Sequence, residues 1–196
     1  LEYVWEADKG PLFFEFHGTP SGVEEQSAMV QDIAKEFGAA DFQWTTKAEE
    51  RTKLWQARHD AYYAGLALRP GSKGMATDVC VPLSRLAECI VETRKDIDQS
   101  GLIAPIVGHV GDGNFHLVLL MDPDDTDEIA RIKALNERMI MRAIAMDGTC
   151  TGEHGVGSGK IDFLVAEHGE AVSVMRAMKM ALDPDNIMNP GKIVRI

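Results

Sequence analysis

The chain has 196 residues, of which 45% are hydrophobic and 26% are charged, proportions typical of a folded globular protein and not of a disordered or fibrous one. The net charge of −11 at pH 7, with no run of Lys or Arg to offset it, disfavours binding to nucleic acid or to anionic lipid. Every apolar stretch is far shorter than the ~20 residues that span a bilayer, so the sequence predicts no transmembrane segment.

The first third of the sequence mixes short apolar runs with helical periodicity. An aromatic-rich run predicts a first strand, and a serine followed by acidic residues is typical of a helix start. A Pro-Gly segment then interrupts a long helical pattern. The predicted elements are, in order, a strand at Leu12–Phe16, a helix from Ser21 to about Gly38, a strand at Phe42–Thr45, a helix at Lys47–Leu68 and a break at Arg69–Gly74.

The remainder of the sequence has clearer periodicity, with amphipathic helices and apolar strands in turn. The predicted elements are strands at Met75–Val81, Leu102–Val110 and Phe115–Met121, helices at Leu83–Ser100 and from Asp124 or Asp125 onward, a loop at Gly148–Lys160, and short helices with a tail. The order of elements predicts an α+β fold with a ferredoxin-like, mainly antiparallel sheet, helices packed on one face, and a C-terminal helical segment.

The glycine-rich loop at Gly152–Lys160 partly matches a nucleotide-binding motif. A Walker loop needs Gly where the chain has His154, and it needs Ser or Thr where Ile161 follows the lysine. The dinucleotide pattern that starts at Gly155 needs Gly where Lys160 stands. We therefore expect neither a P-loop nor a Rossmann fingerprint. A flexible surface loop and a loop that approaches a flat or anionic ligand both remain open.

Two histidines flank a Gly-Asp-Gly-Asn turn and predict a shared site. If Gly111–Asn114 forms a four-residue hairpin turn, His109 pairs directly with His116. Directly opposed residues have Cβ atoms ~5 Å apart on the same face of the sheet, so both imidazoles reach one metal ion. The alternative is a pair of half-buried histidines that only flank a glycine turn.

A divalent ion needs more than two protein ligands, and the glycine-rich loop offers a third. Glu153 is the best candidate, and Asp112 or Asn114 in the turn is placed to reach the ion or to support its ligands. His154 follows Glu153 and is a candidate base, because a nearby cation keeps an imidazole neutral at pH 7.

Two basic residues near the Pro-Gly break are candidates for substrate binding. The Arg69 guanidinium offers bidentate hydrogen bonds to a carboxylate, although a lone arginine in a loop is more often a surface residue. Lys73 is the cation that we expect to favour a dicarboxylate over a monocarboxylate. The three cysteines, which include Cys150 beside the glycine-rich loop, lack CxxC spacing and are expected to be packing residues in a reducing compartment.

Several stretches of the chain together resemble one family, in the right order and over nearly the whole length. The sequences GHVGDGNFH at 108–116, GTCTGEHGVG at 148–157 and LDPDNIMNPGK at 182–192 resemble the C-terminal domain of FAD-linked oxidases of the vanillyl-alcohol-oxidase type. The sequences LALRPG at 66–71 and TDVCVPLSRL at 77–86 are similar to the FAD-dependent D-lactate dehydrogenases of the cytochrome type. They are less similar to the glycolate oxidase and D-2-hydroxyglutarate dehydrogenase branches, which remain alternatives.

This resemblance implies that residues 1–196 form an FAD-linked oxidase C-terminal domain, truncated at its N-terminus and without the FAD-binding domain. It implies that His109, His116 and Glu153 hold zinc or manganese, and that the metal binds a D-2-hydroxy acid. D-Lactate would be oxidised to pyruvate by hydride transfer to FAD, with His154 taking the hydroxyl proton.

The same resemblance implies further contacts and partners. Arg69 would pair with the substrate carboxylate, and Asn189 and Asn114 would approach the flavin. Electrons would pass to cytochrome c, a quinone or another flavoprotein and not to NAD. The expected compartment is the cytoplasm if the source is bacterial and the mitochondrion if it is eukaryotic.

Two readings from other functional classes remain open. In the first, the chain is a metal-binding ferredoxin-like module without catalysis. In the second, it is a structural domain whose glycines and histidines only shape turns. Arg69 and His154 distinguish the enzyme from the module, because a closed structural metal site needs neither a carboxylate clamp nor a spare base.

Overall fold

The computed structural model describes residues 10–39 and 44–196, and the chain divides into two compact units, Leu1–Ala61 and Tyr62–Ile196. The described residues of the first unit form two helices, and a third helix begins at the boundary. The elements are α1 (Pro20–Glu36), α2 (Ala48–His59), α3 (Ala61–Ala67), β1 (Lys73–Ala76), β2 (Val79–Cys80), α4 (Leu83–Ser100), β3 (Ile106–His109), β4 (Asn114–Met121), α5 (Thr126–Ala145), α6 (Ile161–His168) and α7 (Ala171–Leu182).

The start of the first unit differs from the prediction. Residues 12–16 are not a strand, because a strand needs a hydrogen-bonded partner and the described residues offer this run none; instead, the Phe13 ring stacks on Trp55 with centroids 6.2 Å apart. Helix α1 begins one residue before the predicted Ser21, with Thr19 as the N-cap that accepts a hydrogen bond from the Gly22 N–H at 3.3 Å. The predicted strand at 42–45 lies partly outside the described residues, and its last two residues are not in a strand.

The long helix predicted at 47–68 is two helices, α2 and α3, separated at Asp60. The Asp60 N–H still donates to the Gln56 carbonyl at 2.9 Å, and its carboxylate accepts from the Gln56 amide at 2.9 Å. Aspartate is a poor helix former because its side chain competes for nearby polar groups. The apolar periodicity continues across this interruption, which is why the sequence pattern did not reveal it.

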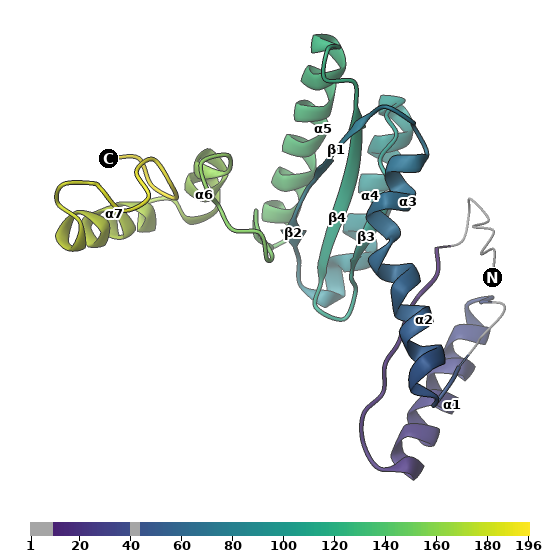
Figure 1. Ribbon diagram of the computed structural model, residues 1–196. Helices are drawn as coiled ribbons and strands as arrows, with labels where there is room; N and C mark the ends of the chain where they lie inside the picture. Colours follow the sequence, from purple (N-terminus) through teal and green to yellow (C-terminus); the bar gives the residue numbers. More distant parts are fainter. Residues whose placement is uncertain (1–9, 40–43) are drawn as a thin grey trace. The chain divides into compact units, whose positions relative to one another are not determined.

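The second unit is built around one central strand, β4, with antiparallel neighbours on both edges (Figure 1). Strand β3 pairs with one edge, and β1 and β2 pair with the other. Ala76 of β1 lies opposite Val118, and Val79 of β2 lies opposite Phe115. Both short strands therefore keep one register, and the single strand predicted at 75–81 is interrupted at residues 77 and 78.

At the interruption, one N–H of the sheet ladder has a different hydrogen-bond acceptor. The Thr77 N–H donates to the Leu117 carbonyl at 3.0 Å as in a regular ladder. The return bond from the Leu117 N–H goes to the Thr77 hydroxyl at 2.8 Å, and not to the Thr77 carbonyl. The Thr77 carbonyl is therefore available to another donor, which proves to be a histidine of the candidate site.

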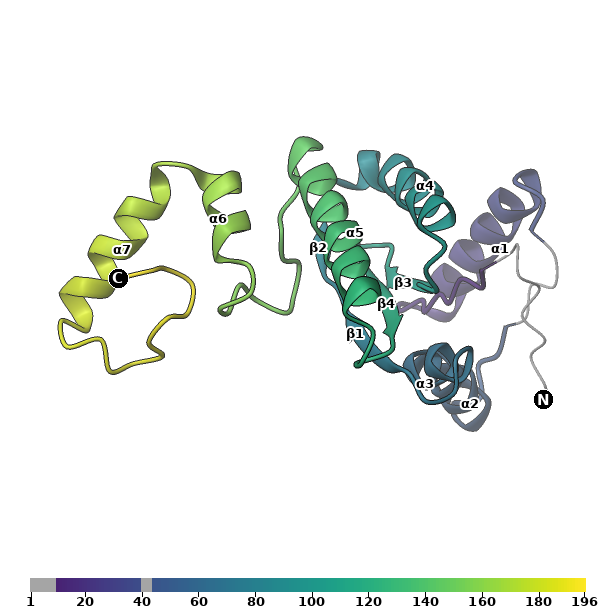
Figure 2. The same cartoon turned by 90° about the horizontal axis from the view of Figure 1, so that it is seen from above.

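Helices α4 and α5 lie side by side on one face of the sheet, as predicted (Figure 2). Both begin close to their predicted positions, and the Asp125 carboxylate caps α5 by accepting the Glu128 N–H at 2.9 Å. Alternate residues of β4 point to this face. The buried core between the layers includes Leu86, Cys89, Ile97, Phe115, Leu117, Leu119, Ile132, Leu135, Met139 and Ile140.

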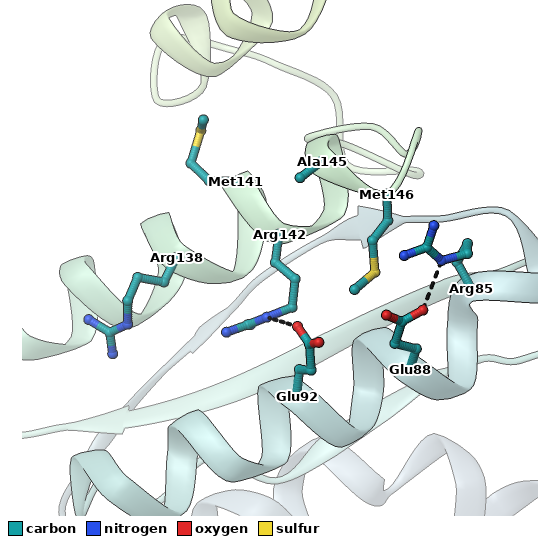
Figure 3. Close-up of a pocket in the computed structure, with 8 residues that line it drawn as sticks. All are labelled: Arg85, Glu88, Glu92, Arg138, Met141, Arg142, Ala145 and Met146. Atoms are coloured by element: carbon teal, nitrogen blue, oxygen red, sulfur yellow. Dashed lines mark hydrogen bonds and ion pairs between the residues drawn. The ribbon is translucent and has the colours of Figure 1, made fainter.

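An open groove of about 620 Å³ runs between the exposed sides of α4 and α5 (Figure 3). Four of its five charged side chains form ion pairs with one another, and Arg138 pairs with Asp96. Arg85 Nε lies 2.9 Å from a Glu88 carboxylate oxygen, and Arg142 Nε lies 3.2 Å from a Glu92 carboxylate oxygen. The Arg142–Glu92 pair joins α5 to α4 on the solvent side of the core, whereas the Arg85–Glu88 pair lies within α4.

The C-terminal segment forms the predicted helical extension. Helices α6 and α7 share a small buried cluster of Leu164, Val172 and Val194. The Ile193 N–H donates to the Gly157 carbonyl at 2.8 Å, which ties the tail to the glycine-rich loop. None of the helices in residues 10–39 and 44–196 has the length and apolar character needed to cross a membrane.

Candidate active site

The β3–β4 hairpin has a different register from the predicted one. His109 lies opposite Asn114, and Val107 lies opposite His116, so the turn is Val110–Gly113 and the predicted direct pairing of the two histidines is wrong. The shift of two residues preserves the side on which each side chain lies. His109 and His116 are diagonal neighbours on one face, with ring centroids 6.0 Å apart.

His116 is the buried anchor of the site, with a side chain only 8% exposed. Its Nδ1 lies 2.8 Å from the Thr77 carbonyl oxygen, which the Leu117 N–H leaves unused. A carbonyl only accepts, so Nδ1 carries a proton and Nε2 is the ring nitrogen that remains for a metal ion. The strand interruption thus fixes the orientation of the His116 ring.

Three imidazoles converge on one carboxylate oxygen. Glu153 Oε1 lies 3.0 Å from His116 Nε2, 3.6 Å from His109 Nε2 and 3.7 Å from His154 Nε2. The His116 and His154 rings stack, with centroids 4.9 Å apart and an interplanar angle of 13°. We call His109, His116, Glu153 and His154 the His–Glu cluster. The structure therefore brings together four of the residues that the sequence singled out.

The His–Glu cluster opens toward solvent on one side. The side chains of His109, Glu153 and His154 are 40%, 49% and 46% exposed, in contrast to buried His116. The cluster lies on the face of the sheet opposite α4 and α5, because His116 alternates with the core-facing residues of β4. This arrangement gives a small molecule access to the exposed side chains of the cluster.

Two overlapping sets of side chains in the described part of the chain have ligand atoms within 4.8 Å of one another. One is His109, His116 and Glu153, and the other is Asp78, His116 and His154. Imidazole nitrogen and carboxylate oxygen suit zinc or manganese. The first set fits such an ion, because the Nε2 atoms of His109 and His116 and the Glu153 carboxylate face one another.

Asp78 supports this site and was not identified from the sequence. Its carboxylate is 1% exposed and accepts hydrogen bonds from Asn114 Nδ2 at 2.8 Å and from the Thr151 hydroxyl at 2.8 Å. It also accepts the backbone N–H groups of Glu153 at 3.1 Å and His154 at 2.9 Å. Burial opposes its ionisation, but these hydrogen bonds outweigh burial and hold the pKa of the Asp78 carboxyl well below its ordinary value.

The end of the glycine-rich loop returns to the same aspartate. Lys160 Nζ donates to the Asp78 carbonyl at 2.9 Å and lies 3.5 Å from its carboxylate. The loop therefore uses its lysine to bind its own chain, which agrees with the absence of a phosphate-binding motif. A polar Thr-Asp pair inside an apolar strand is the one sequence signal that points to Asp78.

Asn114 is buried inside this network. Its Nδ2 donates to Asp78 and to the Val79 carbonyl at 2.9 Å. Its Oδ1 is buried and has no hydrogen-bond partner among the described residues. The amide therefore has one acceptor left for a water or a bound group, and the predicted role of Asn114 in cofactor binding stays a prediction.

Arg69 and Lys73 are not placed with the His–Glu cluster. Arg69 Nη1 lies 2.6 Å from Glu128 Oε1, and Glu128 also accepts the Asp122 N–H at 2.7 Å. Lys73 lies opposite Met121, at this same end of β4, and is exposed. His116 is five residues back along β4, or about 17 Å of extended strand. This placement does not support the predicted substrate contacts.

Asn189 lies in the tail that follows α7. Its backbone adopts a positive φ of 47°, and its carbonyl accepts the Lys192 N–H at 3.2 Å. It is exposed. The conformation marks a turn, and the predicted approach of Asn189 to a flavin stays a prediction.

The chain is similar to known proteins over most of its length. The family model described as "FAD linked oxidases, C-terminal domain" matches residues 5–193. "Probable D-lactate dehydrogenase, mitochondrial" of Danio rerio is 52% identical over 94% of this chain and 37% of its own length. "D-lactate dehydrogenase [cytochrome], mitochondrial" of Arabidopsis thaliana is 45% identical over 93% of this chain and 32% of its own length.

A solved structure shares the fold. The 4-ethylphenol oxidase from Gulosibacter chungangensis, in an isoeugenol complex, aligns with a TM-score of 0.62 and 17% identity over 90% of this chain and 37% of that one. At this identity the match concerns the fold alone. The chain spans about a third of the length of the curated relatives.

Proposed function

Because the chain belongs to the family of FAD-linked oxidase C-terminal domains, we propose that it forms the substrate side of an enzyme that oxidises D-lactate to pyruvate with FAD as hydride acceptor. The family resemblance predicted from the motifs is confirmed by this membership. Both curated relatives are named D-lactate dehydrogenases, which supports lactate over other 2-hydroxy acids. We propose that FAD is held mainly outside this chain, since the relatives are about three times as long.

The observation that carries this proposal is the convergence of three Nε2 atoms on Glu153 Oε1, at 3.0 to 3.7 Å. His109, His116 and Glu153 would hold a divalent metal, zinc or manganese. When bound there, the ion would supply Lewis acidity to the hydroxyl and carboxylate oxygens of the substrate. His116 enters this site already oriented through its Nδ1.

His154 is the proposed base. Its ring stacks on the buried His116 ring, which restricts its orientation, and its side chain is half exposed. His154 Nε2 would take the hydroxyl proton of D-lactate as the C–O bond becomes a carbonyl. FAD, when bound, would accept the α-hydrogen with its electron pair, so that lactate loses one proton and one hydride and becomes pyruvate.

The names of the relatives support a proposal for the electron acceptor and the compartment. The name of the Arabidopsis relative includes cytochrome, which supports cytochrome c over a quinone or another flavoprotein. Both relatives are named mitochondrial proteins, and we propose the same compartment here.

One observation favours the metal-binding module as a second candidate function. Arg69, the expected carboxylate clamp, is bound to Glu128 at 2.6 Å and not placed at the cluster. A module without catalysis would bind the ion and no hydroxy acid. The two functions therefore differ in what the metal-loaded chain binds.

Titration of the purified chain with Zn²⁺ and Mn²⁺ by calorimetry tests the site. We expect near one equivalent of metal for the wild type and loss of binding in His116→Ala. His59→Ala, which removes an exposed histidine of α2, is the control and should bind normally. Equal binding by His116→Ala would contradict the proposed ligand set.

Substrate binding distinguishes the enzyme from the module. The Zn²⁺-loaded chain is titrated with D-lactate, L-lactate, glycolate and D-2-hydroxyglutarate. Preferential binding of D-lactate is the expected result, and preference for glycolate or D-2-hydroxyglutarate would assign the chain to that branch. Binding of none of the four would favour the module.

A further inference from the structure

Asp78 connects three segments that lie far apart in the sequence. It occupies the interruption between β1 and β2, contacts Asn114 at the start of β4, and contacts Thr151, Glu153 and His154 in the glycine-rich loop. Lys160, at the end of that loop, donates to its carbonyl. The Asp78 carboxylate therefore ties the loop to two strands of the sheet.

The Asp78 carboxylate has no capacity left for a metal ion. A carboxylate offers about four lone-pair sites. Oδ1 accepts the Asn114 amide, and Oδ2 accepts the Thr151 hydroxyl and the His154 N–H, while the Glu153 N–H is shared between both oxygens at 3.3 and 3.1 Å. The four donor groups use these sites. The Asp78–His116–His154 set is therefore a weaker metal site than His109–His116–Glu153.

The hydrogen bonds of Asp78 also determine where the loop places its side chains. The consecutive N–H groups of Glu153 and His154 both point to this one carboxylate. These bonds fix two adjacent peptide units. The Glu153 carboxylate then lies 3.0 Å from His116 Nε2, and the His154 ring stacks on the His116 ring. Gly152, just before, passes so close that a Cβ there would lie 2.0 Å from Asn114 Nδ2.

We propose that Asp78 is a positioning residue, which sets the Glu153 carboxylate and the His154 ring for metal and substrate without itself binding the metal. This inference rests on the proposed function of the His–Glu cluster. Buried groups that orient metal ligands typically contribute 10–100-fold to metal affinity.

The test compares Asp78→Asn with the wild-type chain. The substituted amide turns one acceptor oxygen into a donor that faces donors. We expect Zn²⁺ affinity to fall 10–100-fold and the amide hydrogens of residues 153 and 154 in the metal-free chain to exchange faster by NMR or mass spectrometry. Thr151→Val removes one hydrogen bond and should give a smaller change in the same direction, which keeps the test decisive if Asp78→Asn fails to fold.

Asp183→Asn is the matched control. Asp183 is also buried, accepts two backbone N–H groups, from Ile187 and Met188 at 3.0 and 2.9 Å, and pairs with Lys179. Its loss should lower thermal stability as the loss of Asp78 does. It should leave Zn²⁺ affinity and the exchange of amides 153 and 154 unchanged.

Three results would overturn the inference: wild-type Zn²⁺ affinity in Asp78→Asn, unchanged exchange at residues 153 and 154, or an equal loss of affinity in Asp183→Asn. A wild-type chain that binds no Zn²⁺ would instead refute the proposed metal site. In that case faster exchange in Asp78→Asn supports the positioning of the loop, and unchanged exchange overturns it.

Discussion

The carbonyl oxygen of Thr77 lies 2.8 Å from Nδ1 of His116. This carbonyl is available because the neighbouring Leu117 N–H is satisfied by the Thr77 hydroxyl. One threonine therefore performs two tasks: its side chain completes the sheet ladder, and its backbone orients a histidine. The interruption of the edge strand is the structural cause of a correctly oriented Nε2.

Thr77→Val should separate these tasks. Valine has nearly the same shape but leaves the buried Leu117 N–H without an acceptor, which costs about 1–3 kcal/mol of unfolding free energy. If the Thr77 carbonyl then rotates back toward Leu117, His116 loses its partner. We therefore expect weaker Zn²⁺ binding in addition to lower stability in chemical denaturation.

Thr93→Val provides the comparison for this prediction. Thr93 is fully buried, and its hydroxyl accepts from Arg142 at 3.0 Å on the helical side of the sheet. Its substitution should reduce stability and leave metal affinity unchanged. Wild-type Zn²⁺ affinity in Thr77→Val would show that the carbonyl does not depend on the hydroxyl.

The elements that sequence predicts well are those whose determinants are local. Helix α4 has the predicted bounds, Leu83–Ser100, because an apolar stripe defines it and Gly101 with φ of 65° ends it. The α5 start at Asp125 follows from a side-chain cap within three residues. The α+β class follows from the order of such elements.

The register of the β3–β4 hairpin and the hydrogen bonds that support the site could not be predicted, because both depend on contacts between residues far apart in the sequence. The turn before β4 is held by the Gly113 carbonyl, which accepts from the Val81 N–H at 3.0 Å, and by Cys80 Sγ, which donates to the Asp112 carbonyl at 3.3 Å. Asp78 meets His154, which lies 76 positions later. The histidines were nevertheless found, because a two-residue shift keeps them on one face.

Gly152→Ala should disrupt the site. A Cβ at residue 152 would lie 2.0 Å from Asn114 Nδ2 and 3.0 Å from Asp78 Oδ1, so the loop must move away from the sheet. We expect a loss of about 1–3 kcal/mol in unfolding free energy and weaker Zn²⁺ binding. Gly159→Ala, where no atom lies within 4 Å of the added carbon, should be neutral for both, and a neutral Gly152→Ala would contradict the close packing.

Arg69→Met tests whether this arginine has a structural role or binds substrate. The structure pairs it with Glu128 at 2.6 Å, with the Arg69 side chain 34% exposed. A partly exposed ion pair contributes little to the free energy of unfolding. We therefore expect a small fall in melting temperature, unchanged Zn²⁺ affinity and unchanged D-lactate binding by the Zn²⁺-loaded chain. A selective loss of D-lactate binding would restore the predicted carboxylate clamp.

Glu128 should make stability depend on pH in acid. The Asp122 N–H, followed by Arg69, lowers the pKa of the Glu128 carboxyl below its ordinary value of 4.5. A carboxyl with a depressed pKa stabilises the fold above its unfolded pKa, and this stabilisation is lost as the pH falls through the folded pKa. Glu128→Gln should therefore melt below the wild type at pH 7, and the difference should shrink as the pH falls below about 4.5.

Melting temperatures of both chains between pH 7 and pH 3 measure this dependence. Glu137→Gln, which removes an exposed carboxylate of the same helix, controls for the change in net charge. A constant difference between Glu128→Gln and the wild type across the range would mean that Glu128 acts through packing alone. A difference that shrinks with falling pH, and is absent from the control, assigns the effect to the ionised carboxylate held by Asp122 and Arg69.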